Sequence, residues 1–107
     1  MARSSGASVR RANASAVTRA VVDLAAFRHN LDQIRRRLAP RAEMLLVVKS
    51  DAYGHGMVPI ARAAERERSV VYFGVAAADE ALELRRAGIR KPILLLAPVH
   101  PERFREL

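Results

Sequence analysis

Apolar residues begin to recur at regular intervals from Val21 onward. A short extended segment over residues 21–22 is followed by Asp23, whose carboxylate is well suited to cap the first amide groups of a helix. The next apolar residues lie three and four positions apart, as on one side of an amphipathic helix: Leu24, Phe27, Leu31, Ile34 and Leu38. Pro40 ends this pattern, so we predict a helix between Asp23 and Pro40.

Three short aliphatic runs follow. They are MLLVV (44–48), VVYFGV (70–75) and ILLLA (93–97). Unbroken apolar runs are typical of strands that are covered on both faces, so we also expect Tyr72 to lie in the core. Helical patterns separate the runs. Pro59 suits the first turn of a helix that continues to about Arg68, and another helix over residues 79–87 is predicted to stop at Gly88.

The order strand–helix–strand–helix–strand predicts an α/β fold with parallel strands. Two architectures have this order: an open doubly wound sheet, and the opening of a (β/α)₈ TIM barrel. Three strands cannot close a barrel of eight, and a sheet of three would expose unpaired backbone at both edges. We therefore expect the chain to be part of something larger.

The first 19 residues differ in composition from the rest. Residues 1–19 contain four arginines and no acidic residue, and they lack hydrophobic periodicity. We interpret them as a disordered basic leader in front of a domain over residues 20–107. The leader accounts for half of the net charge of +8, and the body carries charges of both signs. A basic stripe with interleaved aromatic residues is missing, so we expect no nucleic-acid partner.

Composition also argues against several other classes of protein. The chain has no cysteine, which excludes disulfides and thiolate chemistry and fits the reducing cytoplasm. No two of its histidines have the spacing of metal ligands, so we expect no metal, and no apolar run is long enough for a membrane role. Asp79, Glu80 and Glu83 share a predicted helix with Arg85 and Arg86, which indicates a solvated face.

Lys49 is a candidate for a reactive residue. The chain has 17 arginines but only two lysines, Lys49 and Lys91, so a charge alone at position 49 would be expected to come from arginine. Unlike a guanidinium, an amine can lose its proton and attack a carbonyl. Lys49 directly follows the first predicted buried strand, and function gathers at the carboxyl ends of strands in both candidate architectures. Position alone leaves open whether Lys49 is reactive or simply ends a strand in water.

The residues after Lys49 add a phenol, an imidazole and two glycines. Gly54 and Gly56 allow a tight turn or the close approach of a ligand. Tyr53 could donate a hydrogen bond to a phosphate or pack against the rim of the sheet, and His55 could orient the loop. The spacing matches neither a P-loop nor the Rossmann fingerprint.

Residues 47–56, VVKSDAYGHG, resemble the pyridoxal-phosphate lysine motif of the alanine racemase family. Two flanking segments resemble the same family in the same order: VVDLAAFRHNLDQIR, which includes Asn30, and FGVAAADEALELRRAGIRKPILLL. The resemblance covers residues 20–97. It implies that the chain is the incomplete N-terminal part, about three strands, of a (β/α)₈ barrel that binds pyridoxal 5'-phosphate.

The resemblance also implies roles for two residues. Lys49 would bond covalently to the cofactor and act as the base on one face of the substrate, and Tyr53 would help to hold the cofactor phosphate. In the family, a second tyrosine from the partner subunit of a homodimer works on the opposite face. The expected activity is the interconversion of L-alanine and D-alanine, which supplies D-alanine for peptidoglycan in the cytoplasm.

Some features depart from the family pattern or leave other functions open. Ser50-Asp51 replaces the more usual Ala-Asn, and neither Tyr53 nor Tyr72 can take the role of the second tyrosine. We therefore expect this chain alone to have little or no racemase activity. The alternatives are a serine or broad-specificity racemase of the same fold type, a non-catalytic pyridoxal-phosphate-binding protein, against which AYGHG argues, and a basic binding protein that acts through its leader.

Overall fold

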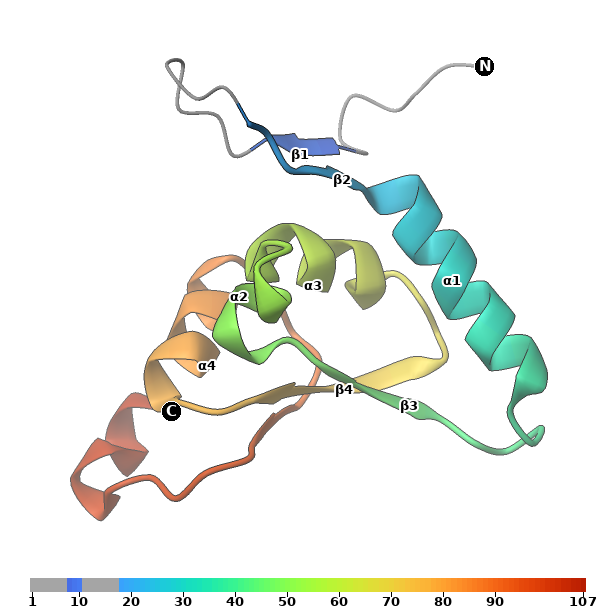
Figure 1. Ribbon diagram of the computed structural model, residues 1–107. Helices are drawn as coiled ribbons and strands as arrows, with labels where there is room; N and C mark the ends of the chain where they lie inside the picture. Colours follow the sequence, from blue (N-terminus) through green and yellow to red (C-terminus); the bar gives the residue numbers. More distant parts are fainter. Residues whose placement is uncertain (1–7, 11–17) are drawn as a thin grey trace.

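The computed structural model describes residues 8–10 and 18–107. Within the segment predicted as a leader, β1 (Ser8–Arg10) pairs in antiparallel fashion with β2 (Val21–Asp23), an association that the sequence pattern did not predict (Figure 1). The other leader residues, 1–7 and 11–17, lie outside the described ranges, so for them the leader stays a prediction. None of the helices in the described ranges has the length and apolarity that crossing a membrane requires.

Helix α1 (Leu24–Arg37) begins where the sequence predicted. The Asp23 carboxylate accepts hydrogen bonds from the amides of Ala25 at 2.9 Å and Ala26 at 3.2 Å, which confirms the predicted N-cap. Leu24 and Leu31 are buried, but Ile34 is 49% exposed, so the far end of the predicted apolar stripe lies beyond the core.

A parallel three-stranded sheet forms the centre of the structure. Its strands lie in the order β3 (Met44–Val47), β4 (Val70–Val75) and β5 (Ile93–Leu95), which confirms the predicted parallel α/β arrangement. The connecting helices are α3 (Met57–Glu65) and α4 (Ala78–Arg86), and a short 3₁₀ helix, η1 (Pro101–Glu106), ends the chain. A turn labelled α2 (Lys49–Tyr53) lies between β3 and α3.

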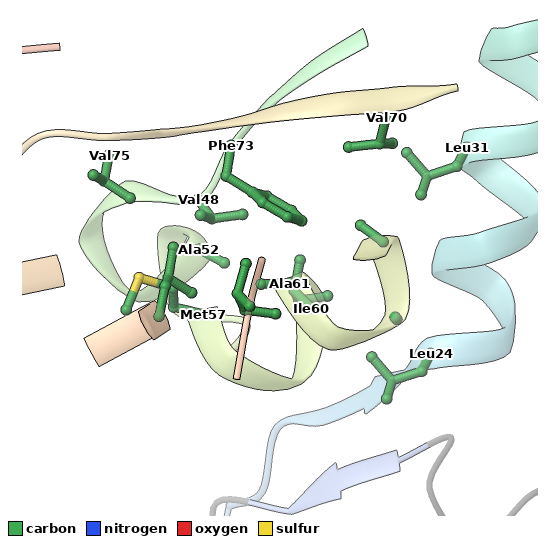
Figure 2. Close-up of a cluster of buried hydrophobic side chains, with 14 of the residues drawn as sticks. Leu24, Leu31, Val48, Ala52, Met57, Ile60, Ala61, Val70, Phe73 and Val75 are labelled. Atoms are coloured by element: carbon green, nitrogen blue, oxygen red, sulfur yellow. The ribbon is translucent and has the colours of Figure 1, made fainter. Parts of the chain in front are cut away.

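The core lies between one face of this sheet and the helices. Phe73 and Val75 of β4 are fully buried, and in Figure 2 Phe73 extends toward the side of the sheet where Ile60 and Ala61 of α3 lie. Leu31 of α1 closes the same cluster from the side (Figure 2). Phe73 and Val75 alternate along β4 with Tyr72 and Gly74, as the two-residue period of a strand requires, whereas the buried Val70 lies before an irregularity in the pairing with β3.

The other face of the sheet is apolar and exposed. Its exposed residues, here called the open face, are Leu45, Tyr72, Leu94 and Leu96, which are 40 to 48% exposed. The prediction that the strands are covered on both faces is therefore wrong for the described residues, and so is the expected burial of Tyr72. A continuous apolar run does not indicate which of the two faces of the strand is packed against other elements of the same chain.

Lys91 connects the loop before β4 to the loop before β5. Its ammonium donates hydrogen bonds to the carbonyl oxygens of Glu67 at 2.6 Å, Ala64 at 3.3 Å and Val70. The carboxylate of Glu65 accepts from the backbone amide of Lys91 at 3.3 Å. Burial lowers the pKa of Lys91, and the charges of Glu65 and Glu67 only partly oppose that effect. This second lysine is thus a structural one.

Candidate active site

Lys49 lies at the carboxyl end of β3, where sequence reasoning placed it. The residue before it, Val48, is fully buried and donates its amide to Gly74 of β4 at 2.8 Å, so the sheet supports the chain up to Lys49. The side chain of Lys49 is half-buried. Within the described part of the chain, its amine makes no hydrogen bond, in contrast to that of Lys91, and its positive charge acts on Glu80.

The turn that follows Lys49 is left-handed. Ser50, Asp51, Ala52 and Tyr53 all have φ between 53° and 56°, a region that residues with a side chain rarely adopt. Each such residue costs about 1–2 kcal/mol relative to the right-handed form. Gly54 continues with φ of 89°, where glycine is not strained. The sequence pattern predicted only a loop here and gave no indication of its handedness.

Two carboxylates and one imidazole hold this turn in place. Asp51 accepts from the amide of Met57, the first residue of α3, at 2.8 Å. Glu80 accepts from the amide of Ser50 at 2.7 Å. His55 Nδ1 lies 2.9 Å from the carbonyl oxygen of Ala52, which can only accept, so the ring carries its proton on Nδ1. This contact agrees with the expectation that His55 orients the loop.

The interpretation of Glu80 as part of a solvated face is wrong. Its carboxylate is half-buried and accepts from Ala76 at 2.8 Å and Ala77 at 2.9 Å in addition to Ser50. Burial raises the pKa of Glu80, but the three amide donors and the positive charge of Lys49 together outweigh burial, so its pKa is lowered from the usual value. The only signal in the sequence was an acidic residue in the first turn of a helix.

A cavity of about 390 Å³ adjoins the turn on the side of α1. Tyr53 and His55 line it together with Phe27 and Asn30 of α1, which brings the family-like Asn30 close to the motif. Lys49 does not line this cavity, and Tyr53 is 61% exposed. In the described residues, no three His, Asp or Glu side chains are grouped as a metal ion would need.

The fold and this site define a class of protein. A parallel β/α sheet with a lysine-bearing turn at the carboxyl end of its first strand is the arrangement of the N-terminal part of a TIM barrel, and the solved structures described below share it. Residues 22–107 match the family model described as "Alanine racemase, N-terminal domain". The chain belongs to that family.

Individual relatives agree with the family match. The chain is 46% identical over 85 residues to an alanine racemase of Desulforamulus reducens and 49% identical over 85 residues to one of Syntrophobacter fumaroxidans, with 79% of the chain covered in both cases. These alignments span 23% and 22% of the two relatives, so the chain corresponds to less than a quarter of their length.

Solved structures show the same fold. The chain resembles an alanine racemase of Clostridium difficile 630 in complex with cycloserine, with a TM-score of 0.73 and 41% identity over 78% of the chain and 22% of that protein. It also resembles an alanine racemase of Bacillus anthracis with bound L-Ala-P, with a TM-score of 0.69 and 44% identity over 75% of the chain and 20% of that protein.

Proposed function

We propose that this chain is the N-terminal portion of a pyridoxal-phosphate-dependent alanine racemase, which interconverts L-alanine and D-alanine. The observation that carries the proposal is the state of Lys49. Its amine stands half-buried at the carboxyl end of β3 without an acceptor in the described residues, on a turn that Asp51 and Glu80 hold in a strained form. A lysine that served only as a surface charge would not need such support.

The residues of the site suit this cofactor. A free amine suits its aldehyde, and the exposed phenol of Tyr53, next to a cavity, suits its phosphate. When bound, the cofactor would supply an electron sink that stabilises the negative charge left at the α-carbon after proton removal. Lys49 would hold the cofactor and carry the proton on one face of the substrate, and Tyr53 would orient the phosphate.

The other catalytic residues, including the tyrosine that works on the opposite face of the substrate, are proposed to lie outside this chain. The chain spans about a fifth of its relatives, and the tyrosine expected to work on the opposite face has no counterpart among its two tyrosines. We therefore expect the complete enzyme to be a cytoplasmic homodimer that supplies D-alanine for peptidoglycan. The related enzymes solved with cycloserine and with L-Ala-P support a small amino acid as the substrate.

Covalent labelling of the chain tests the role of Lys49. The chain is incubated with pyridoxal 5'-phosphate, reduced with borohydride, digested and mapped by mass spectrometry. We expect the label on Lys49 well ahead of Lys91, whose amine already donates to three carbonyls. The control variant Lys49→Arg keeps the charge but removes the nucleophile. Labelling of Lys91 as fast as Lys49, or unchanged total labelling of Lys49→Arg, would refute the proposal.

The phosphate role of Tyr53 has its own test. Tyr53→Phe removes only the hydroxyl, so it should weaken binding of pyridoxal 5'-phosphate about tenfold or more, the effect of one hydrogen bond to a charged group. Binding of pyridoxal, which has no phosphate, should be unaffected. Equal weakening of both compounds would show that Tyr53 acts by packing and not through the phosphate.

A further inference from the structure

Three backbone amides from two separate parts of the chain converge on the carboxylate of Glu80. Its Oε1 accepts from Ala76 at 2.8 Å and from Ala77 at 2.9 Å, which lie between the end of β4 and the start of α4. Its Oε2 accepts from Ser50 at 2.7 Å, thirty positions earlier in the chain. Capping of α4 uses the first oxygen alone, so the contact of the second oxygen with Ser50 needs a separate explanation.

The amide of Ser50 belongs to the peptide bond that follows Lys49. Because a peptide unit is planar, a bond that fixes this N–H also fixes the plane attached to the α-carbon of Lys49. Ser50 is also the first of the left-handed residues, with φ of 54°. The contact with Glu80 therefore lies where the supported strand changes into the strained turn.

We propose that Glu80 is a positioning residue for Lys49: by accepting the Ser50 amide, it ties the peptide unit after the lysine to the end of the neighbouring strand and so sets the direction in which the amine projects. Glu80 does not itself touch substrate or cofactor. The inference rests on the proposed function of Lys49, because it assigns Glu80 a purpose only if Lys49 is the reactive group.

The variant Glu80→Gln tests this role with little change in shape. Glutamine has one acceptor oxygen, which keeps two bonds if it faces Ala76 and Ala77 and then turns an N–H₂ group toward the amide of Ser50. Glu83→Gln is the matched control, because Glu83 is exposed on the same helix and undergoes the same chemical change. Glu80→Asp keeps the charge but is one methylene shorter.

Two measurements are made on each chain. Amide hydrogen exchange is followed by NMR at Ser50, with Phe73 and Leu84 as buried reference amides. The ratio of pyridoxal-phosphate labelling at Lys49 to that at Lys91 is measured after borohydride reduction. In Glu80→Gln and Glu80→Asp we expect protection of Ser50 to fall about tenfold or more, in line with loss of a bond to a charged acceptor. We also expect the labelling ratio to fall at least about threefold.

A merely structural role would give a different result. Loosening of the whole fold would expose Lys91 and the reference amides, so labelling of Lys91 would rise and protection of Phe73 would fall. That result would overturn the proposal. So would an unchanged labelling ratio despite lost protection of Ser50, and so would a Glu80→Asp variant that retains both the protection of Ser50 and the labelling ratio. The control Glu83→Gln should match the unmodified chain in both measurements.

A measurement on the unmodified chain covers the case in which the variants do not fold. The amide proton signals of Ser50, Ala76 and Ala77 should shift together in an acid titration, because all three report on one carboxylate. If the amide signal of Ser50 shifted at a different pH from those of Ala76 and Ala77, the proposed contact between Glu80 and Ser50 would be overturned. If the contact between Glu80 and Ser50 is present but Lys49 is not labelled ahead of Lys91, the proposed function fails while the contact stands. Failure of the proposed function can therefore be distinguished from failure of the positioning role of Glu80.

Discussion

Replacing Lys91 by methionine should destabilise the fold, while the same replacement at Lys49 should leave stability nearly unchanged. Methionine keeps most of the apolar stem but cannot donate a hydrogen bond. At position 91 the change removes the donor from the carbonyls of Glu67, Ala64 and Val70. It also removes the positive charge next to Glu65, whose Oε2 is buried without a hydrogen-bond partner among the described residues.

The size of the effect follows from these contacts. A hydrogen bond from a charged donor contributes about 1.5–3 kcal/mol, so the two shorter bonds of Lys91 amount to roughly 3–6 kcal/mol. Desolvation opposes this gain, as the lowered pKa of Lys91 indicates, and water can replace part of the lost donor because the side chain is only half-buried. We therefore expect Lys91→Met to lower the free energy of unfolding by about 2 kcal/mol.

Urea unfolding at neutral pH, followed by far-ultraviolet circular dichroism, measures both variants. Lys49→Met should remain within about 0.5 kcal/mol of the unmodified chain, since Lys49 has no hydrogen bond to lose within the described ranges. The two lysines are the only ones in the sequence, so they form a matched pair. Equal losses at both positions, or a loss at Lys91 below about 0.5 kcal/mol, would refute the assignment of Lys91 as a structural anchor.

Other features predict further changes in stability. Because the pKa of Glu80 is lowered in the folded state, the contribution of Glu80 to stability is complete above the ordinary pKa of 4.5 and is lost as the pH falls through the folded pKa. The urea midpoints of the unmodified chain and of Glu80→Gln should therefore converge in acid. A difference between the midpoints that stays constant with pH would contradict this linkage. Gly88→Ala should cost about 1 kcal/mol in thermal unfolding, because φ of 89° strains any side chain although no atom lies within 4 Å. Gly74→Ala should cost less than about 1 kcal/mol, because its new methyl group meets the mobile end of the exposed Leu45 side chain at 2.9 Å, and a larger loss would indicate that Leu45 cannot move aside.

Local signals in the sequence predicted most of the fold. Asp23 as a cap, Gly88 as a stop and the aliphatic run of β4 each depend on neighbouring residues, and the structure confirms them. The exposure of Tyr72 could not be predicted in this way. In a continuous apolar strand both faces have the same composition, so only the arrangement of the helices decides which face is buried.

The candidate site was predictable in part for a similar reason. The position of Lys49 at the end of a strand follows from the sequence, since strand and turn are contiguous. The contact of Glu80 with Ser50 joins residues thirty positions apart, and the local pattern of α4 suggested only a solvated acidic turn. The left-handed form of Ser50 to Tyr53 was also missed, because serine, alanine and tyrosine have no preference for it.

The strain of that turn must be offset by its anchors. Four left-handed residues at about 1–2 kcal/mol each amount to roughly 4–8 kcal/mol, comparable with the whole stability of many small domains. The bonds of Asp51 to Met57 and of Glu80 to Ser50 contribute about 1.5–3 kcal/mol each. The backbone bonds from Ala52 to Val48 and from Gly54 to Ser50 add about 1 kcal/mol each, for a sum of roughly 5–8 kcal/mol.

A near balance of strain and anchoring has a consequence for the lysine. On one side of Lys49 the chain is fixed by the sheet through Val48, and on the other side it is fixed by a turn to which both carboxylates are hydrogen-bonded. The loss of either carboxylate would release the turn toward right-handed conformations, and the side chain of Lys49 would then project in a different direction. Rigid support on both sides of one amine is what the proposed covalent attachment of a cofactor in a single orientation would require.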